Sequence, residues 1–275
     1  MRSPLLVLKE QINHFYLIRR LSLYELKSAN NTNYLGMAWE VINPLIQIGI
    51  YWFVFGYGIR QRPEVEVAPD NFVPFLPWML TGFILWFFFY QSTIKGSKSV
   101  YTRLRMLSKM NFPMSVIPNF VIFSQLYIHV IMVVITIIIL NIMGFYFNIY
   151  YLQIFYFLFA TVAFSYALSL ITSTLSTIIR DVHMFLNASL RMLLYLSPIL
   201  WSVDTSNLDG WIKIIMKINP LYYLIEGYRA GFLGLNWYLI DNWQYTLYFW
   251  GITLVLFIIG SNLHVKFRRH FIDFL

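Results

Sequence analysis

The sequence predicts an all-α integral membrane protein with six transmembrane helices, an N-terminal cytoplasmic amphipathic helix, and re-entrant or interfacial helices between spans five and six. Two observations predict this class. Hydrophobic residues make up 59% of the 275 residues and charged residues only 12%, about half the charged fraction of a soluble domain. The apolar residues are also gathered into long runs, and about 20 apolar residues in a helix cross the hydrocarbon core of a bilayer.

Six stretches have the length and composition of a transmembrane helix. They lie near residues 41–59, 73–94, 117–144, 150–178, 184–203 and 243–263. Each is expected to be helical, because an unpaired backbone cannot be placed in lipid. The third and fourth stretches are longer than a bilayer requires, so we expect these helices to tilt or protrude.

Positive charge is distributed unevenly among the connecting segments. With six spans, most of the 20 Lys and Arg residues fall on one side: Arg2, Lys9, Arg19, Arg20, Lys27, Lys95, Lys98, Arg103, Arg105, Lys109, Arg180, Lys266, Arg268 and Arg269. The other side holds Arg60, Arg62, Lys213, Lys217 and Arg229, which are outnumbered there by acidic residues. Because cytoplasmic loops are enriched in Lys and Arg, both termini are predicted to be cytoplasmic. Topology thus explains the net charge of +8, and nucleic-acid binding is not expected.

The N-terminal segment 1–37 is predicted to lie in the cytoplasmic interface. Within residues 5–28, Leu5, Leu8, Ile12 and Phe15 recur at helical spacing, while charged residues fall elsewhere around the helix. This pattern is typical of an amphipathic helix at a membrane surface. Such a helix would serve either as a simple topology anchor or as a gate or brace for a cytoplasmic partner.

The segment 205–240 on the opposite side is neither a span nor an ordinary loop. Its apolar stretch 221–234 is too short to cross a bilayer and too apolar for an open loop, which favours re-entrant or interfacial half-helices. Asn219-Pro220 would break the helix. The glycines at 227, 231 and 234 would allow close packing. The alternative is an interfacial cap over the outer leaflet.

The connection 95–116 contains the dense basic stretch RLRMLSKMNFP, from Arg103 to Pro113. We expect a short cytoplasmic helix over Ser99–Met110 with Arg103 and Arg105 exposed. Because Pro113 disfavours helix at Phe112, the chain should turn there and project the phenyl ring. The positive-inside rule alone explains the charges, whereas a contact with another protein would also explain the exposed ring.

The sequence contains no recognisable catalytic constellation. There is no Gly-Lys dipeptide and hence no Walker A loop, and no H-E-x-x-H or G-x-S-x-G motif is present. Cysteine is absent, which excludes disulfides, thiolate metal sites and thiol nucleophiles. We therefore assign no catalytic residue, metal or cofactor to this chain.

Ionisable residues inside the predicted spans are few. They are Glu40 at the inner edge of span one, His129 and Arg191. A charge at the bilayer centre costs at least about 2.5–3.5 kcal/mol, so Arg191 should either face protein, water or substrate, or reach to the inner interface. The buried carboxylates of an ion-coupled carrier are missing. A membrane-embedded enzyme acting on polyprenyl lipids would need clustered acidic residues, and beyond Asp181 the cytoplasmic loops contain almost none.

Six stretches of the sequence carry a family resemblance. They are NYLGMAWEVINPLIQIGIYWFVFGYGIR (33–60), FLPWMLTGFILWFFF (75–89), GSKSVYTRLRMLSKMNFPMSVIP (96–118), IIRDVHMFL (178–186), LSPILW (196–201) and INPLYYLIEGYRAGFLG (218–234). In these stretches the chain resembles the permease subunit of ABC-2 type exporters of cell-surface polysaccharides and polyol phosphates. Within that family, SKMNFP and EQINHFYLIRRLSLYELKS look closest to the permeases that export wall teichoic acid. O-antigen permeases share the same plan but usually differ in this loop.

The resemblance implies a homodimer in the bacterial plasma membrane, with two copies of a cytoplasmic P-loop ATPase that bind ATP and magnesium. The cargo implied is an anionic polymer linked to undecaprenyl diphosphate, with another surface glycan such as O-antigen as the alternative. The chain itself would be a transport subunit and not an enzyme. The residues implied in ATPase coupling are Arg103, Arg105, Lys109, Met110, Asn111, Phe112, Pro113, Arg180 and Asp181.

The resemblance also implies a lined path between the two protomers, closed at its outer mouth by the helices at 211–234. Arg191 is the candidate for contacting phosphate. Tyr195 lies one turn further along the same span, and Trp201 lies nearly three turns further, at a less favourable angle. The remaining candidates for the pathway or its gate are Tyr222, Tyr223, Glu226 and Arg229.

Overall fold

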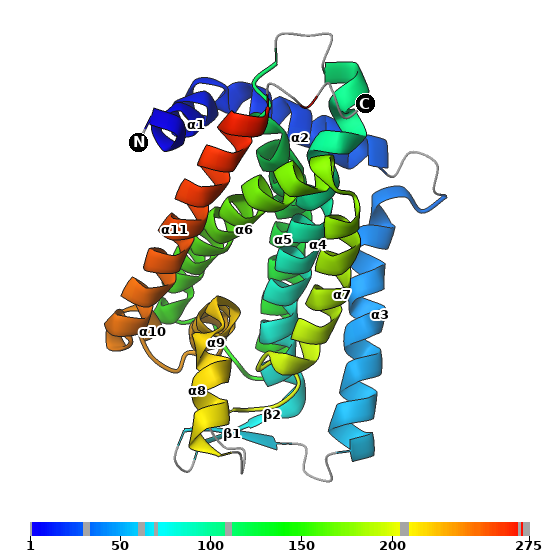
Figure 1. Cartoon of the computed structure of the whole chain (residues 1–275). Helices are drawn as coiled ribbons and strands as arrows, with labels where there is room; N and C mark the ends of the chain where they lie inside the picture. Colours follow the sequence, from blue (N-terminus) through cyan, green and yellow to red (C-terminus); the bar gives the residue numbers. More distant parts are fainter. Residues whose placement is uncertain are drawn as a thin grey trace.

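The computed structural model describes residues 2–29, 34–59, 64–68, 71–107, 112–203, 209–268 and 271. The fold is a bundle of long helices, and the described ends of the chain lie at the same end of it (Figure 1). We call this the inner end, and the opposite end, which carries the strands, the outer end. The longest helices are α4 (Phe75–Leu107), α5 (Val116–Ile142), α6 (Leu152–Ile178) and α11 (Trp243–Phe267).

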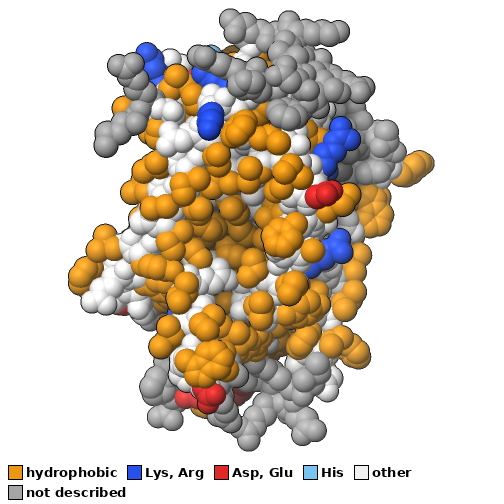
Figure 2. Space-filling view, viewed as in Figure 1, with side chains coloured by type: hydrophobic (Ala, Val, Ile, Leu, Met, Phe, Trp, Pro, Cys, Tyr) orange, Lys and Arg blue, Asp and Glu red, His pale blue; other side chains and the backbone are white. Residues whose placement is uncertain are grey.

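Five helical segments of the described chain are long and apolar enough to cross a membrane. They are Gly36–Gly58, Phe75–Leu104, Val116–Ile142, Ile149–Ile178 and Trp243–Phe267. The first combines the short helix η1 (Gly36–Ala38), α3 (Trp39–Tyr51) and the wider π-type helix η2 (Trp52–Ile59). Figure 2 shows apolar side chains over most of the visible face, with Lys and Arg mainly in its upper half, toward the inner end. The chain is therefore a multi-pass membrane protein.

The fifth predicted span, 184–203, is not one continuous helix. Helix α7 runs from Asp181 to Leu196, 16 residues, and ends at Ser197, whose backbone is extended. Pro198 explains this end, because a proline disfavours helix at the residue before it. Residues 197–200 are buried without being helical, so the prediction of a helix to residue 203 is wrong.

The N-terminal segment forms two consecutive helices that meet at His14, α1 (Arg2–Asn13) and α2 (Phe15–Ala29). Both lie across the inner end of the bundle (Figure 1). The predicted apolar residues point outward: Leu5 is 67% exposed and Ile12 75%. Val7 and Ile18 are instead fully buried against the bundle. The segment thus has one apolar face toward the bundle and another toward its surroundings.

Helix α4 is much longer than the predicted span 73–94. Its 33 residues continue to Leu107, about 50 Å at 1.5 Å per residue. The predicted separate helix over Ser99–Met110 is therefore wrong, because residues 95–107 extend the membrane helix itself. Lys and Arg are good helix formers, so the basic composition did not require a break.

The outer end contains a small β-hairpin that an all-α prediction misses. Strand β1 (Glu64–Ala68) pairs antiparallel with β2 (Asn71–Pro74), and Val65 lies opposite Val73. Both valines are buried, at 3% and 4% exposure, while Glu64 and Glu66 point outward. The alternation of Glu and Val in this segment is the period-two pattern of a half-buried strand.

The segment 205–240 forms short helices, α8 (Gly210–Ile218), α9 (Pro220–Leu233) and α10 (Tyr238–Asp241). The predicted break at Asn219-Pro220 is confirmed, and the Asn219 side chain accepts a hydrogen bond from the Leu221 backbone nitrogen at 3.1 Å. Helix α9 packs against α4, α6 and α11. Close packing at Gly227 is also confirmed, because an added Cβ would lie 2.2 Å from the Phe157 ring.

Candidate functional site

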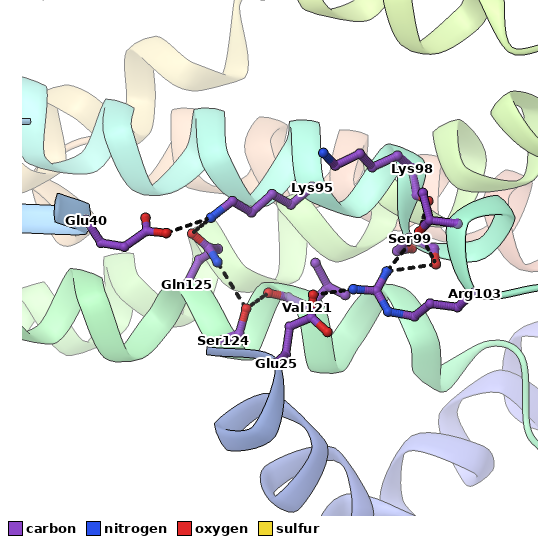
Figure 3. A network of polar contacts seen from close by, with 10 residues as sticks. Glu25, Glu40, Lys95, Lys98, Ser99, Arg103, Val121, Ser124 and Gln125 are labelled. Carbon is purple, nitrogen blue, oxygen red and sulfur yellow. Dashed lines mark hydrogen bonds and ion pairs between the residues drawn. The ribbon is translucent and has the colours of Figure 1, made fainter. Parts of the chain in front are cut away.

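A polar network at the inner end links three helices (Figure 3). The Lys95 ammonium of α4 lies 3.4 Å from the Glu40 carboxylate at the start of α3. It also donates a 3.0 Å hydrogen bond to the side-chain oxygen of Gln125 on α5. Helix α3 makes few other contacts with the bundle. The network therefore gives Glu40 a structural role, attaching α3 to its neighbours.

Arg103 continues this network toward α2. Its guanidinium forms an ion pair with Glu25, donates a 3.0 Å hydrogen bond to the Ser99 carbonyl, and lies 5.5 Å from the ring centre of Phe120. The side chain is only 20% exposed. The prediction that Arg103 is exposed is therefore wrong. In this conformation it holds α2 against α4.

The structure describes only some of the remaining residues of the predicted coupling connection. Lys109, Met110 and Asn111 and the side chain of Arg105 lie outside the described residues. Phe112 and Pro113 are half-buried. The Phe112 ring packs against a cluster that includes Ile18, Leu104 and Val116. The prediction that this ring projects freely from the turn is wrong, because α2, α4 and α5 provide an apolar surface for it.

Arg180 and Asp181 are both exposed, at the turn between α6 and α7. This turn lies at the inner end of the bundle (Figure 1). Asp181 also sits in the first turn of α7, where a negative charge is favourable for the helix dipole. The two side chains are accessible to another protein without any rearrangement of the fold.

Two cavities lie along the inner half of the bundle and share Glu40 and Gln125. The larger, about 300 Å³, is also lined by Glu25, Lys95, Lys98 and Arg103. The smaller, about 70 Å³, reaches His129. His129 is buried and shares a 2.9 Å hydrogen bond with the hydroxyl of Tyr228 on α9. Polar groups therefore extend from the inner end toward the outer helices within one protomer.

The predicted pathway residues on α7 lie on its outward face. Arg191 is exposed and Tyr195 is 54% exposed. Trp201 is half-buried and donates a 2.9 Å hydrogen bond from its indole nitrogen to the Tyr195 carbonyl. The same surface of α7 carries exposed Phe185 and Met192. The exposed side chains on this face of α7 are therefore free to contact lipid or another protein chain.

Arg229 is 1% exposed and fully engaged inside the outer half of the bundle. Its guanidinium lies 2.6 Å from the Glu226 carboxylate and 3.5 Å from the ring centre of Trp78. It also donates hydrogen bonds to the backbone carbonyls of Trp78 at 3.2 Å and Ile199 at 3.4 Å. Arg229 therefore joins α9 to α4 and to the segment after α7, and it does not face a path in this conformation.

The two adjacent tyrosines of α9 have different surroundings. Tyr223 is fully buried, and its hydroxyl lies 3.1 Å from that of Tyr156 and 2.8 Å from that of Thr246. Burial raises the pKa of Tyr223 above its ordinary value, so the phenol stays neutral. Tyr222 and Glu226 instead line an outer cavity of about 420 Å³. The structure therefore does not bring the predicted pathway residues into a single site.

Sequence reasoning missed the carboxylates that hold the inner end together. Besides the Glu25 and Glu40 pairs, Glu10 of α1 lies 2.8 Å from Arg268 after α11. The sequence signal for these polar contacts is Gln125 within α5, because a polar side chain in a transmembrane helix usually has a polar partner. Among the described residues, no group of three or more acidic or His side chains could hold a metal ion.

A family model for ABC-2 type transporters matches residues 16–233. This range covers most of the chain, from α2 to the end of α9, so the chain belongs to the ABC-2 transporter permease family. Its relatives include two proteins of Klebsiella pneumoniae named "O-antigen export system permease protein RfbA". They are 27% and 26% identical, and each alignment covers 91% of this chain and 92% of the relative. A protein of the same name from Myxococcus xanthus is 22% identical over 76% of both chains.

Proposed function

We propose that this chain is the membrane subunit of an ATP-driven exporter that moves a lipid-linked surface polysaccharide out of the cytoplasm. The observation that carries the proposal is the family match over residues 16–233. Full-length similarity to permeases named for O-antigen export supports a glycan as the cargo. The absence of a Walker A sequence supports a separate subunit as the source of energy.

The proposed topology has six crossings, with α7 and residues 197–203 as the fifth. Helices α3, α4, α5, α6, α7 and α11 each run between the inner and outer ends (Figure 1). The 16 residues of α7 span about 24 Å, and the non-helical residues 197–200 after it are buried by protein, as irregular backbone at membrane depth must be. An even number of crossings would put both termini on the same side, and the positive-inside rule favours the cytoplasmic side.

The ATPase is proposed to bind at the inner end, where Arg180 and Asp181 are accessible. The adjoining connection from Arg105 to Pro113 would complete the contact surface. Two ATPase copies, each with ATP and magnesium, would serve a permease dimer. Arg103 pairs with Glu25 of α2, and Phe112 packs on the apolar cluster that contains Ile18 of α2. Movement of the contact surface would therefore be transmitted to α2.

A second copy of the chain is proposed to cover the exposed face of α7. Arg191 lies on that face among apolar side chains. Contact with lipid near the bilayer centre would cost at least about 2.5–3.5 kcal/mol. A hydrated path between two protomers would keep Arg191 in water and place it, with Tyr195, beside a diphosphate carrier lipid such as undecaprenyl diphosphate.

The polymer is proposed to be an O-antigen-like polysaccharide, because the full-length relatives carry that name. Wall teichoic acid is the second candidate, favoured by the sequence SKMNFP in the inner connection. A polyprenyl-lipid enzyme is a weaker alternative. The inner carboxylates Glu10, Glu25 and Glu40 are each paired with a cation and are not grouped to hold a metal and a diphosphate.

The first test is purification of the tagged full-length chain from its native membrane in a mild detergent, followed by a search for a copurifying P-loop ATPase. We expect the ATPase with the wild-type chain and its loss with Asp181→Lys. The matched control is Asp241→Lys, which makes the same change at an exposed aspartate of the outer end. Absence of any ATPase from the wild-type preparation would overturn the proposal.

Phe112 is tested separately, because its ring contributes to folding as well as to any contact. Phe112→Leu keeps an apolar side chain on the cluster that contains Ile18 and Leu104, whereas Phe112→Asp does not. If Phe112 anchors the ATPase, Phe112→Leu should weaken copurification while leaving the melting temperature nearly unchanged. If ATPase binding falls only in parallel with stability, the ring acts in folding alone.

A further inference from the structure

The outer cavity is bounded by elements from distant parts of the sequence. The hairpin contributes Asn71, helix α9 contributes Tyr222 and Glu226, and the start of α11 contributes Tyr245. The cavity holds about 420 Å³, which lies within the range of about 300–1,000 Å³ found for small-molecule sites. It belongs to the end of the molecule where the exported material would emerge.

Aromatic rings form one wall of this cavity. The rings of Tyr222 and Tyr245 lie 6.2 Å apart and are inclined by 34°. Tyr245 is partly exposed and is fixed by a hydrogen bond from its hydroxyl to the Lys217 carbonyl, whereas Tyr222 is only 4% exposed and supports the Tyr245 ring. Rigid aromatic side chains offer large contact area at small entropic cost. The flat C–H faces of a pyranose ring are suited to such a wall.

Amide side chains form the polar part of the lining. Within the described chain, the side-chain amides of Asn71, Asn236 and Asn242 make no hydrogen bond. Asn242 occupies the N-cap position of α11, but its side chain does not bond to the backbone of that helix. Each amide offers both a donor and an acceptor, which matches the neighbouring hydroxyl groups of a sugar. Glu226 adds a carboxylate acceptor that is held in place at 2.6 Å by the buried Arg229.

The charge of the cavity argues for a sugar over a phosphodiester. Among the described residues that line it, Lys217 is the single cation, and its ammonium lies 5.7 Å from the ring centre of Tyr222. Phosphate sites in proteins gather Arg, Lys or several backbone N–H groups. A carboxylate that accepts hydrogen bonds is instead favourable for hydroxyl groups.

We propose that this outer cavity binds a pyranose unit of the exported polymer after it has crossed the membrane. The proposal rests on the proposed export function and names the chemical class that the outer end recognises. A bound sugar would oppose backward movement of the chain between ATPase cycles. Assignment of the cavity to a pyranose also predicts that the polymer contains sugar rings and is not a simple polyol phosphate.

The test uses the purified full-length chain and two fluorescently labelled probes. One is a set of oligosaccharides of two to four units released from the surface glycan of the organism that carries this chain. The other is synthetic tri(glycerol phosphate). Binding is measured by fluorescence anisotropy with wild type, with the double variant Asn236→Ala/Asn242→Ala, and with Gln244→Ala. Gln244 is an exposed amide of the outer end that does not line the cavity.

We expect the oligosaccharides to bind wild type and Gln244→Ala equally, within twofold. The double variant should bind them about 10- to 30-fold more weakly, because two hydrogen bonds are lost. Lack of oligosaccharide binding, equal binding by the double variant, or preferential binding of tri(glycerol phosphate) would each overturn the proposal. Copurification of the ATPase, measured on the same preparations, separates the two hypotheses: if the ATPase is present and the sugar is not bound, only the cavity assignment fails.

Discussion

The two ends of the bundle are held together by different chemistry. At the inner end, Glu10–Arg268, Glu25–Arg103 and Glu40–Lys95 join α1, α2 and α3 to the rest of the molecule, and the paired side chains are 19–28% exposed. At the outer end, the buried helix α9 packs through aromatic rings. The Arg229 guanidinium of α9 is 1% exposed, pairs with Glu226 of the same helix and contacts Trp78 of α4.

This difference separates a part that can rearrange from a part that cannot. Ion pairs near water contribute about 0–1 kcal/mol each, so the inner contacts can be exchanged for others at little cost. Moving α9 away from α4 would instead strip the buried Arg229 guanidinium of its contacts with Trp78, and an uncompensated buried charge costs about 3–5 kcal/mol. We therefore expect motion driven by an ATPase to displace α1, α2 and α3 while α9 stays fixed to α4 and α6.

The largest effect is expected from removing the buried cation of the outer end. Arg229→Met removes the ion pair with Glu226, the contact with the Trp78 ring and the hydrogen bonds to the buried Trp78 and Ile199 carbonyls. We expect a loss of about 3–5 kcal/mol of unfolding free energy, or roughly 10 °C in melting temperature. Thermal unfolding in detergent, followed by circular dichroism, measures this loss.

The control for this variant removes both charges. Glu226→Gln/Arg229→Met removes both charges of the pair, so the part of the loss that comes from the broken ion pair should return. If the double variant is no more stable than Arg229→Met alone, the cost comes from lost packing on Trp78 rather than from charge. If Arg229→Met melts like wild type, the outer end is not the rigid part.

A smaller loss is expected from filling the close contact between α9 and α6. In Gly227→Ala, the new methyl group would lie 2.2 Å from the Phe157 ring, which is fully buried. Overpacking of this kind costs about 1–3 kcal/mol. Gly251→Ala on α11 is the matched control, since nothing lies within 4 Å of its added Cβ and alanine favours a helix over glycine by about 1 kcal/mol. The two variants should therefore shift the melting temperature in opposite directions, and equal losses would contradict the packing argument.

The apolar spans could be predicted from the sequence because their length is set by the bilayer, and α5, α6 and α11 follow the hydrophobic runs closely. Two local sequence signals mark features that the six-span prediction lacks. Pro198 ends α7 at Leu196, and the Glu-Val alternation at 64–67 forms β1. The extension of α4 to Leu107 cannot be predicted from charge, because lysine and arginine are compatible with helix as well as with a loop.

The candidate site could be predicted only in part, for a physical reason. Glu226 and Arg229 are three residues apart on one helix, a spacing at which side chains meet. The Trp78 carbonyl that also holds Arg229 is 151 residues away in sequence. Likewise, Glu25 and Arg103 are separated by 78 residues. Such partners are set by how the helices pack together, which periodicity and composition do not encode.

The smallest loss of stability is expected at the inner end, and its dependence on salt distinguishes the two ends. Arg103→Gln removes the pair with Glu25, and we expect a loss of about 1 kcal/mol or less, a shift of a few degrees in melting temperature. Charge exchange in Glu25→Arg/Arg103→Glu should restore most of it. At about 1 M salt the Debye length falls to about 3 Å, so the difference between Arg103→Gln and wild type should shrink, whereas that of Arg229→Met should persist. A salt-independent loss in Arg103→Gln would mean that its contacts with Ser99 and Phe120, rather than the ion pair, hold α2 to α4, and that the two ends do not differ in the way proposed.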